Sequence, residues 1–414
     1  MPACRLSAGW ALPVEGSPIA QAAVLIDPDG RIARVGPEAE VPAPPDVPAS
    51  RHPDAVLVPG LVNVHTHLEL TGLGGEVDDA EFAEWIRHLR ERKAARAPDA
   101  WAEAARRGVA DCWAGGVTTV ADTGDSGAVI RALAELGGTG IAYQEVFGPH
   151  PEQCATSLAA LVESVTRSSR FASERVRIGV SPHAPYTVSG PLYSGTAAWA
   201  RGAGLPIAVH LAESPAETQL LRGAAGPFAE AWRRRGIPAP AQPGCSPVAW
   251  LERHGVLGPD TLAIHVVQVD ADDIARLARA GSAVAHCPRS NRRHGHGAAP
   301  LGRLLAAGLR VGLGTDSEVS VGALDLLAEA RAARELAGLS ADGALELATL
   351  GGARALGLEG EIGSLLPGKW GDIAAVRVEP GTADSLAERV LESRRDHVVA
   401  TYVGGRQVYR RPEA

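Results

Sequence analysis

Two histidines one residue apart, His65 and His67, follow a short apolar stretch of the chain. Side chains alternate across a β-strand, so both imidazoles would project from one face, with Thr66 on the other. Two imidazoles at the end of a buried strand can bind one divalent metal. The same short pattern also fits histidines that only complete hydrogen bonds near a core, so the remaining chain decides between the two interpretations.

Further histidines and one aspartate end apolar runs later in the chain. The runs 176–183, 205–210 and 261–265 end in His183, His210 and His265, and the run 310–316 ends in Asp316. A single buried histidine is most often structural. Several of them, each at the end of a strand-like run, favour a metal site instead.

The order of the predicted elements places these residues together. Eight strand-like runs, beginning with the one that leads to His65, alternate with helical segments as far as about residue 355. Eight βα units of this total length favour an α/β fold of the (β/α)8 TIM-barrel type over an open doubly wound sheet. The carboxyl ends of the strands then meet at one mouth, which is where this fold carries its chemistry.

Strand-like segments at both chain ends lie outside this alternation. Near the start, Asp27-Pro28-Asp29-Gly30 is a hairpin signal between two apolar runs, and 363–376 and 398–409 return to strand character. We therefore predict a small β-sandwich domain from residues 1–58 and 360–414, beside a barrel domain of residues 59–359. The conformation of the Pro- and Gly-rich insertion at 223–246 is left open.

The predicted metal ligands are His65, His67, His210 and Asp316. Three or four nitrogen and oxygen ligands with a position left for water are typical of catalytic zinc, and iron(II) or manganese accept the same donors. One such divalent ion per chain lowers the pKa of its water to about 7, which provides hydroxide at neutral pH.

Three side chains are predicted to do the proton chemistry. Glu213 follows His210 where the chain leaves the strand, which suits a proton shuttle between the water and a substrate ring nitrogen. It could instead be a carboxylate at the N-terminus of the helix that begins at 214–215. His265 is expected to stabilise the developing tetrahedral centre, and Asp316 to orient or deprotonate the water.

The composition narrows the classes of function. The formal net charge is −8 and no basic run is present, so nucleic acid is not an expected partner. Five dispersed cysteines without a CxxC pattern indicate neither a disulfide framework nor a zinc knuckle. With no signal peptide and no apolar stretch long enough to span a membrane, a membrane partner is not expected and the cytoplasm is the predicted location.

Short motifs along residues 55–376 give the chain a resemblance to the amidohydrolase superfamily, in its mononuclear deaminase and chlorohydrolase branch. The family's ligand roles then fall on the four predicted ligands, its proton shuttle on Glu213 and its catalytic histidine on His265. The motifs are Pro-Gly-Leu-Val-Asn-Val-His-Thr-His (59–67), Ser-Pro-His-Ala-Pro-Tyr-Thr (181–187), His-Leu-Ala-Glu-Ser (210–214), Ile-His (264–265), His-Cys-Pro-Arg-Ser-Asn (286–291), Gly-Thr-Asp-Ser (314–317) and Pro-Gly-Lys-Trp-Gly-Asp-Ile (367–373).

The resemblance also implies a single metal. Binuclear members of the superfamily bridge two metals with a carboxylated lysine at the end of the fourth strand. Here that place offers Ser181-Pro182-His183, and neither of the two lysines, Lys93 and Lys369, is predicted to lie near it. His183 is therefore expected to contact the substrate.

Within the branch, the motifs at 181–187 and 286–291 are most similar to those of aminodeoxyfutalosine deaminases. The resemblance implies conversion of an aminopurine substrate, 6-amino-6-deoxyfutalosine, to futalosine and ammonia in menaquinone biosynthesis. Arg289 could pair with the substrate's benzoate or could brace its own loop. Glu69 and Glu145 are candidates for contacts with ribose hydroxyls.

Several alternatives stay open. Adenosine, S-adenosylhomocysteine and guanine deaminases and triazine chlorohydrolases belong to the same branch, and loops set the substrate. A non-catalytic binding protein on an old enzyme scaffold is an alternative of another class, against which the complete ligand set and Glu213 argue. A homodimer is expected by analogy with the branch. The roles of His286, His294 and His296 are not predicted.

Overall fold

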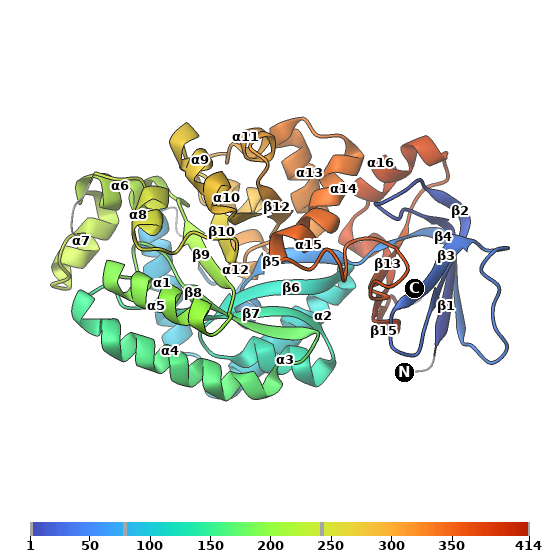
Figure 1. Cartoon of the computed structure of the whole chain (residues 1–414), viewed down its shortest axis with the longest axis horizontal. Helices are drawn as coiled ribbons and strands as arrows, with labels where there is room; N and C mark the ends of the chain where they lie inside the picture. The colour runs from blue at the N-terminus through green and yellow to red at the C-terminus, as the bar shows by residue number, and fades with distance from the viewer. Residues whose placement is uncertain (1–2, 78–80, 241–243, 413–414) are drawn as a thin grey trace.

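The structure is a computed structural model in which residues 3–77, 81–240 and 244–412 are described. Its centre is an eight-stranded parallel sheet that curls into a nearly closed barrel (Figure 1). A bridge between Thr66 and Asp316 joins the first strand to the segment after the last one. The predicted TIM barrel is confirmed. Its strands are β5 (Leu61–Thr66), β6 (Val117–Gly124), β7 (Thr139–Val146), β8 (Val176–Pro182), β9 (Ile207–Leu211), β10 (Thr261–His265), β11 (Ala283–His286) and β12 (Arg310–Leu313).

Helices cover the outer face of the barrel, and this explains why its strands are apolar along their whole length. Every residue of β5, β9, β10 and β11 is buried, as expected for parallel strands that are covered on both faces. The helices include α2 (Pro98–Ala114), α3 (Ala128–Leu136), α4 (Cys154–Ser168), α5 (Gly190–Gly202), α6 (Pro215–Gly223), α8 (Pro247–Arg253), α9 (Ala271–Ala280), α10 (Pro288–Arg293), α11 (Leu301–Ala306), α12 (Glu318–Val321), α13 (Leu326–Ala337), α14 (Ala341–Leu347) and α15 (Leu350–Leu356).

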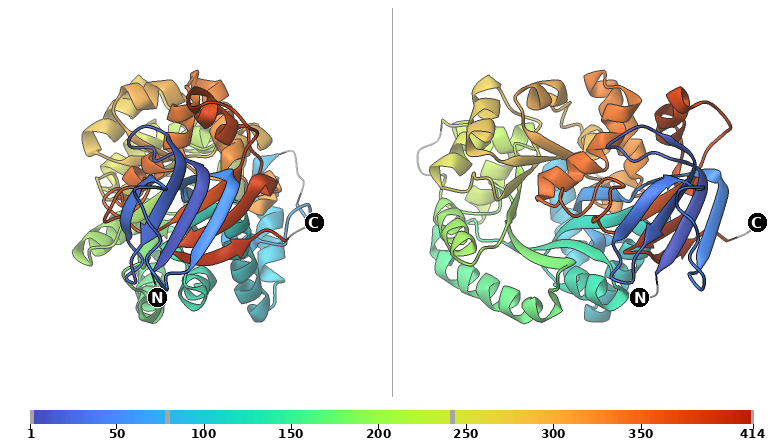
Figure 2. Two further views of the ribbon diagram at one scale, coloured as in Figure 1. Left: turned by 90° about the vertical axis from the view of Figure 1, so that its right-hand side faces the viewer. Right: turned by 45° about the vertical axis from the view of Figure 1, so that its right-hand side comes forward.

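The two chain ends form a second sheet beside the barrel (Figure 2). Ile373 pairs with Pro59, which joins the C-terminal strands to the N-terminal ones. The small β domain built from both chain ends is confirmed, and its seven strands form one continuous hydrogen-bonded sheet. In sheet order the strands are β15 (Arg406–Arg410), β14 (Val398–Val403), β13 (Ile373–Arg377), β4 (Ala49–Pro59), β1 (Cys4–Ala11), β2 (Ile19–Ile26) and β3 (Ile32–Pro37), and α16 (Leu386–Leu391) lies in the connection between β13 and β14.

The chain passes from this sheet into the barrel at Gly60. A Cβ atom at this position would lie only 2.1 Å from the hydroxyl oxygen of Thr118, so the close approach of the two segments requires a glycine. The apolar run that precedes His65 is thus divided between two sheets, with β4 ending at Pro59 and β5 beginning at Leu61.

Two further helices, α1 (Phe82–Ala94) and α7 (Gly226–Arg234), belong to the end of the barrel opposite the terminal sheet. In Figure 1, α6, α7 and α8 gather at that end, where the carboxyl ends of the strands point. Helix α7 is part of the insertion at 223–246, whose residues 241–243 lie outside the described part of the chain. Phe82 of α1 and Phe228 of α7 contact each other edge to face, with ring centroids 6.3 Å apart, so the two helices pack together.

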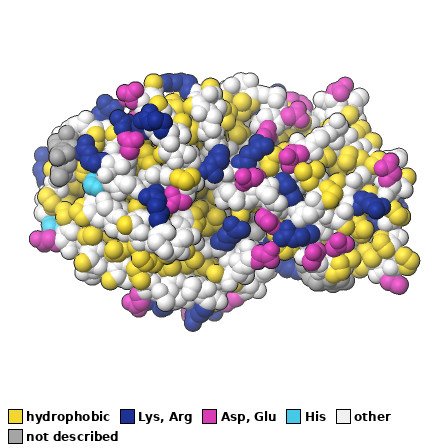
Figure 3. All heavy atoms as spheres, viewed as in Figure 1, with side chains coloured by type: hydrophobic (Ala, Val, Ile, Leu, Met, Phe, Trp, Pro, Cys, Tyr) yellow, Lys and Arg dark blue, Asp and Glu magenta, His cyan; other side chains and the backbone are white. Residues whose placement is uncertain are grey.

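The described surface carries both signs of charge. On the face shown in Figure 3, basic and acidic side chains are mixed, with apolar side chains between them. In the described ranges, no helix combines the length and the apolar character that a membrane crossing requires.

Candidate active site

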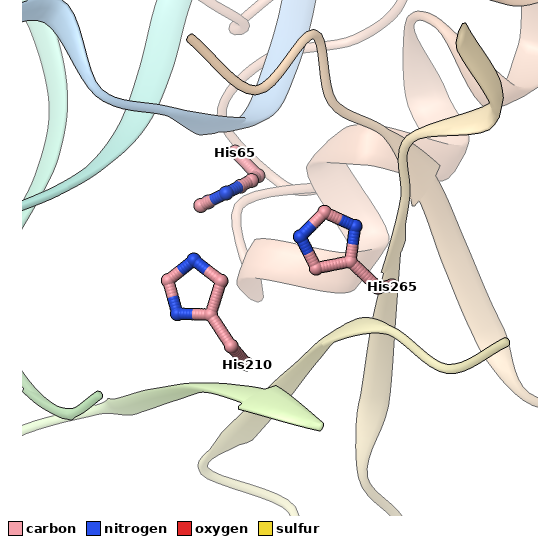
Figure 4. Close-up of side chains that lie close together, drawn as sticks. All are labelled: His65, His210 and His265. Atoms are coloured by element: carbon pink, nitrogen blue, oxygen red, sulfur yellow. The ribbon is translucent and has the colours of Figure 1, made fainter. Parts of the chain in front are cut away.

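The carboxyl ends of the barrel strands bring the predicted ligands together. His65 lies on β5 and His67 directly after it, His210 lies on β9, and Asp316 follows β12. His265 is the last residue of β10. Figure 4 shows the rings of His65, His210 and His265 converging on one space, and their centroids lie 4.9 Å (His65 to His210) and 5.6 Å (His65 to His265) apart.

The distances between donor atoms fit a shared cation. Nε2 of His67 lies 3.2 Å from Nε2 of His210. Oδ1 of Asp316 lies 3.7 Å from Nε2 of His65 and 3.6 Å from Nε2 of His67. All four side chains are buried or nearly so. The ligand atoms of His65, His67 and Asp316 lie within 4.8 Å of one another, as do those of His65, His210 and His265, and separations of this size suit one ion beside His65.

Two of the imidazole rings form hydrogen bonds through the nitrogen that points away from the metal site. These bonds determine which ring nitrogen turns a lone pair towards the site. Nδ1 of His67 donates to the carbonyl of Thr123 at 2.8 Å, and Nδ1 of His210 donates to the carbonyl of His183 at 3.1 Å. A carbonyl only accepts, so in a neutral ring both Nε2 atoms carry lone pairs. Two lone pairs that face each other at 3.2 Å repel unless a cation lies between them. Carbonyls that fix ligating imidazoles in this way are a regular feature of metal sites.

His65 gives a second indication of a metal. Both of its ring nitrogens are buried without a hydrogen-bond partner, and such orphaned groups are rare in folded proteins. Burial, and then the neighbouring histidines, lower the pKa of His65 well below its usual value. The same two causes lower the pKa of His210 to about 3. The imidazoles are therefore neutral donors, and the residues present fit a divalent metal.

The backbone is strained where these side chains leave the strands. Four residues here that are not glycine have left-handed φ angles, which are 51° at Ala212, 73° at His265, 51° at Val266 and 61° at Asp316. Such conformations cost about 1–3 kcal/mol each and persist where surrounding structure enforces them, often at functional sites. Here they turn the chain so that His265, Asp316 and, after Ala212, Glu213 face the mouth.

Glu213 faces the metal site and does not serve as the cap of α6. Ser214 is the residue that caps this helix, and its hydroxyl accepts from the backbone N–H of Glu217 at 3.3 Å. Oε1 of Glu213 lies 3.6 Å from Nε2 of His265 and 3.2 Å from Nε2 of His296. Burial raises the pKa of Glu213, but His265 and His296 outweigh this effect and hold the pKa well below its usual range. The carboxylate is therefore ionised and able to accept a proton.

The motif at 286–291 holds catalytic side chains in place. Asn291 accepts a hydrogen bond from Nδ1 of His265 at 2.9 Å, and the hydroxyl of Ser290 donates to Oδ2 of Asp316 at 2.6 Å. These contacts orient the two groups that face the reaction. The sequence identified the motif by resemblance but did not predict these two roles.

Arg289, in the same motif, adopts the second of the two roles considered for it. Its guanidinium lies 3.5 Å from Oε1 of Glu329 and donates to the carbonyls of Val321 and Ala323 at 3.2 and 3.3 Å. Its backbone N–H donates to the other oxygen of Glu329 at 3.0 Å. Arg289 does not line the cavity. The interpretation as a substrate contact is corrected accordingly, because the guanidinium is engaged by its own loop.

A cavity of about 460 Å³ extends outward from the predicted ligands, a size within the range of small-molecule sites. His183 and Glu145 line it, as expected for substrate contacts, and Oε1 of Glu145 is buried without a hydrogen-bond partner. Glu69 does not line it. Its carboxylate accepts from the backbone N–H and the hydroxyl of Ser126 beneath the cavity wall, so Glu69 supports the wall and the contact with ribose predicted for it is corrected.

Lys93 lines the same cavity, although the sequence did not place it there. Its ammonium lies 3.0 Å from Asp125 and 3.5 Å from Glu69. Burial lowers the pKa of Lys93, but the attraction of these two carboxylates and of Glu145 outweighs burial and raises the pKa above its usual value. The ammonium therefore stays charged. A helical signal was present, because Lys93 falls four and eight residues after Leu89 and Trp85, on one face of α1.

The three histidines without a predicted role differ from one another. His296 contacts Glu213, as described above. His294 lines the cavity, and its Nε2 lies 3.1 Å from the hydroxyl of Ser320. His286 is buried on β11 and does not line the cavity, and burial followed by the influence of His265 lowers its pKa to about 3.

Known proteins resemble this chain along most of its length. Residues 56–408 match the amidohydrolase family. The chain is 32% identical to a 5-methylthioadenosine/S-adenosylhomocysteine deaminase of Symbiobacterium thermophilum, over 98% of this chain and 93% of that protein. It is 35% identical to an aminodeoxyfutalosine deaminase of Deinococcus radiodurans, over 75% of each chain.

Solved structures show the same fold. An adenosine deaminase from Xanthomonas campestris with bound zinc superposes with a TM-score of 0.82 at 26% identity, over 98% of this chain and 92% of that one. An aminofutalosine deaminase of Helicobacter pylori superposes with a TM-score of 0.85 at 21% identity, over 98% and 100% of the two chains. The match over residues 56–408, together with these relatives, shows that the chain belongs to the amidohydrolase family.

Proposed function

We propose that this protein is a metal-dependent hydrolytic deaminase of adenosine-like nucleosides, which replaces the amino group of the purine by oxygen and releases ammonia. The observation that carries the proposal is the position of Glu213. Its ionised carboxylate lies beside the four predicted ligands and faces a cavity that can accept a nucleoside. A carboxylate in this position can move a proton between water and a ring nitrogen.

The four donors His65, His67, His210 and Asp316 would hold one divalent metal, and we propose zinc. When bound there, the metal supplies a Lewis acid that lowers the pKa of a water molecule. The Xanthomonas campestris adenosine deaminase, which has the same fold, has bound zinc.

The protein side chains then account for the protons. Glu213 accepts a proton from the attacking water and delivers it to a ring nitrogen, which makes the amino-bearing carbon more electrophilic. The hydroxyl of Ser290 holds Asp316, which accepts the second proton of the water and returns it to the departing amine. The amide of Asn291 holds His265, and Nε2 of this ring lies 3.6 Å from Oε1 of Glu213, beside the site of attack. One water is consumed and one ammonia leaves, which balances the reaction.

Two polar side chains that line the cavity, His183 and Glu145, suit the hydroxyl groups of a ribose. The hydroxyl of Thr187 donates to the carbonyl of Ala184 at 3.1 Å, and it therefore accepts from Nδ1 of His183 at 2.8 Å. Because Nδ1 of His183 carries the proton of the neutral ring, Nε2 carries a lone pair. Nε2 lies 4.0 Å from Oε1 of Glu145. His183 and Glu145 line the cavity, where Nε2 of His183 can accept from a substrate hydroxyl. Burial raises the pKa of Glu145 well above its usual value, so its carboxyl group can donate to a substrate hydroxyl as well as accept from one.

We propose 6-amino-6-deoxyfutalosine as the first substrate to test, because the motifs resemble those of aminodeoxyfutalosine deaminases. S-adenosylhomocysteine and 5-methylthioadenosine are the next compounds, since relatives such as the Symbiobacterium thermophilum protein are named for them. A 5'-deoxyadenosine deaminase of Methanothermobacter thermautotrophicus is a further relative, 32% identical over 77% of this chain.

The test is to incubate the zinc-loaded protein with these nucleosides, adenosine, guanine and a chlorotriazine, and to follow ammonia together with the purine absorbance. We expect deamination of at least one adenosine-like nucleoside and its loss in Glu213→Gln, which should keep its zinc. A zinc-replete protein that releases no ammonia from any purine would overturn the proposal. Release of chloride from the triazine would then favour a chlorohydrolase, and inertness towards every compound would favour a binding protein.

A further inference from the structure

The cavity has an outer part that the proposed chemistry does not use. Arg90, near the C-terminal end of α1, and Arg235, which directly follows α7, both line it. Both side chains are exposed, in contrast to the buried ligands at the inner end. Between the two ends lie the aromatic side chains of Phe82 and Trp85, whose rings stack with centroids 5.9 Å apart.

The charges of these two arginines are not neutralised by any residue that the structure describes. Within the described ranges, neither guanidinium forms an ion pair or a hydrogen bond with another residue. Many other arginines do so, and in Figure 3 basic side chains commonly lie beside acidic ones. Burial, and then the positive charge of Arg90, lower the pKa of Arg235. The two like charges are thus close enough to repel each other.

The segment that carries Arg235 is held against the cavity wall. The indole N–H of Trp232 donates to the carbonyl of Tyr186 at 2.9 Å. The ring of Tyr186 stacks on Phe228 with centroids 4.1 Å apart and an angle of 2° between the planes. The backbone N–H of Arg235 donates to the carbonyl of Trp232 at 3.0 Å. These contacts hold the end of α7 beside α1. The packing of the two helices therefore places both arginines at the same cavity.

We propose that Arg90 and Arg235 bind an anionic group at the end of the substrate remote from the purine. The inference rests on the proposed function, because it assumes that the purine lies at the inner end of the cavity. A guanidinium pair matches a carboxylate or a phosphate through charge-assisted, bidentate hydrogen bonds. The enzyme therefore acts on nucleosides whose ribose carries an acidic 5′ substituent, and neutral nucleosides are poorer substrates.

This assignment replaces the role considered for Arg289. Arg289 is engaged with Glu329 and two carbonyls, whereas Arg90 and Arg235 have no ion-pair or hydrogen-bond partner for their guanidinium groups among the described residues. The proposal divides the substrates for which the relatives are named into those with an anionic group and those without one. S-adenosylhomocysteine and 6-amino-6-deoxyfutalosine carry a carboxylate, whereas 5-methylthioadenosine and adenosine carry none.

The experiment measures binding and turnover in parallel. Dissociation constants are determined by calorimetry in the Glu213→Gln background, where bound nucleosides are not consumed, and kcat/KM is determined with Glu213 intact. The ligands are 6-amino-6-deoxyfutalosine and S-adenosylhomocysteine as carboxylates, adenosine monophosphate as a phosphate, and 5-methylthioadenosine as the neutral reference. The variants are Arg90→Gln, Arg235→Gln and both together. Arg234→Gln is the control, because Arg234 is an exposed arginine at the end of α7 that does not line the cavity.

We expect the double variant to lose about 10- to 100-fold in affinity and in kcat/KM for the anionic nucleoside, chiefly through KM. The values for 5-methylthioadenosine should change by less than about twofold, and Arg234→Gln should behave as the parent protein. A larger effect on the carboxylates than on adenosine monophosphate identifies a carboxylate as the natural partner, and the reverse identifies a phosphate.

Equal losses for neutral and anionic nucleosides, or no loss for either, would overturn the inference. Failure of the proposed function gives a different result, namely nucleosides that bind without being deaminated by the zinc-loaded protein. The binding measurements decide the role of the arginines in that case as well. If no nucleoside binds at all, both proposals fail.

Discussion

The inner and outer parts of the cavity differ in how their polar groups are held. At the inner end, the side chains of His65, His265 and Asp316 are 0%, 1% and 9% exposed, and neighbouring groups orient His265 and Asp316. At the outer end, Arg90 and Arg235 are exposed and have no ion-pair partner in the described part of the chain. A reaction needs its groups preorganised, whereas recognition of a substituent can use mobile charges that only the ligand neutralises.

Removal of an inner-end ligand should have the largest effect. Asp316→Ala removes a predicted metal ligand and the proposed acceptor of a water proton, so we expect kcat/KM to fall at least about 10³-fold. Metal analysis of the purified variant should show less zinc per chain than the parent protein. Asp342→Ala is a matched control, because Asp342 is exposed in the first turn of α14. A variant that kept its metal and more than a tenth of its activity would contradict the proposed role of Asp316.

The second-largest effect should follow from removing a group that orients a side chain at the inner end of the cavity. Asn291→Ala removes the acceptor for Nδ1 of His265, and we expect kcat to fall about 10- to 100-fold while zinc is retained. Asn291→Asp keeps an oxygen in this position and should recover part of the loss. Equal activity in the two variants would show that packing, and not the hydrogen bond, is what matters. Steady-state kinetics with metal analysis distinguishes these results.

A change in the aromatic wall between the two ends should be milder. Trp85 lines the cavity and stacks on Phe82, so Trp85→Leu should raise KM about 10-fold and leave kcat within about twofold. Trp199→Leu on α5 is the control, because Trp199 does not line the cavity. A fall in kcat with unchanged KM would instead show that the aromatic wall contributes to the reaction. The inner and outer parts of the cavity would then not differ in function as proposed.

The smallest effect concerns the pH dependence of the free energy of unfolding. It arises from Glu329, which contacts Arg289 in the segment that also carries Asn291. Burial raises the pKa of Glu329 to about 8, although Arg289 opposes the shift. In the unfolded chain this carboxyl ionises near pH 4.3, so the folded state holds the extra proton between about pH 4.3 and 8. Its contribution to stability is therefore complete below this window and is lost as the pH rises through it, by at most about 1.4 kcal/mol per pH unit. Denaturant unfolding of Glu329→Gln should show a flatter pH dependence than the parent protein, and parallel curves would contradict this assignment.

Much of the architecture could be predicted because local patterns specify it. Apolar runs that alternate with helical segments predicted the barrel, and the hairpin signal near Gly30 with the strand-like C-terminal segments predicted the second sheet. The predicted ligands meet as expected, since parallel strands in a barrel end at one mouth. The roles of Ser290, Asn291 and His296 could not be predicted, because each depends on a neighbour from another strand or loop.

Some of the predictions at the cavity wall needed correction for the same reason. Arg289 and Glu69 follow strands, as substrate-binding residues do, but their partners Glu329 and Ser126 come from other segments and draw them away from the cavity. Lys93 was expected to lie apart from the fourth strand, yet α1 places it against the cavity. Spacing along the chain predicts the end of the barrel at which a side chain lies, but not the partner that it finds there.

The sequence alone determined the barrel, the terminal sheet and the cluster of imidazoles with Asp316 and Glu213, because these follow from periodicity and from where each strand ends. Only the tertiary structure decided which nitrogens face the metal site and which side chains hold the catalytic groups. It also decided that Arg90 and Arg235 share one cavity. These features depend on contacts between segments far apart in the chain, and such contacts exist only after the barrel has closed and α1 and α7 have packed over its mouth.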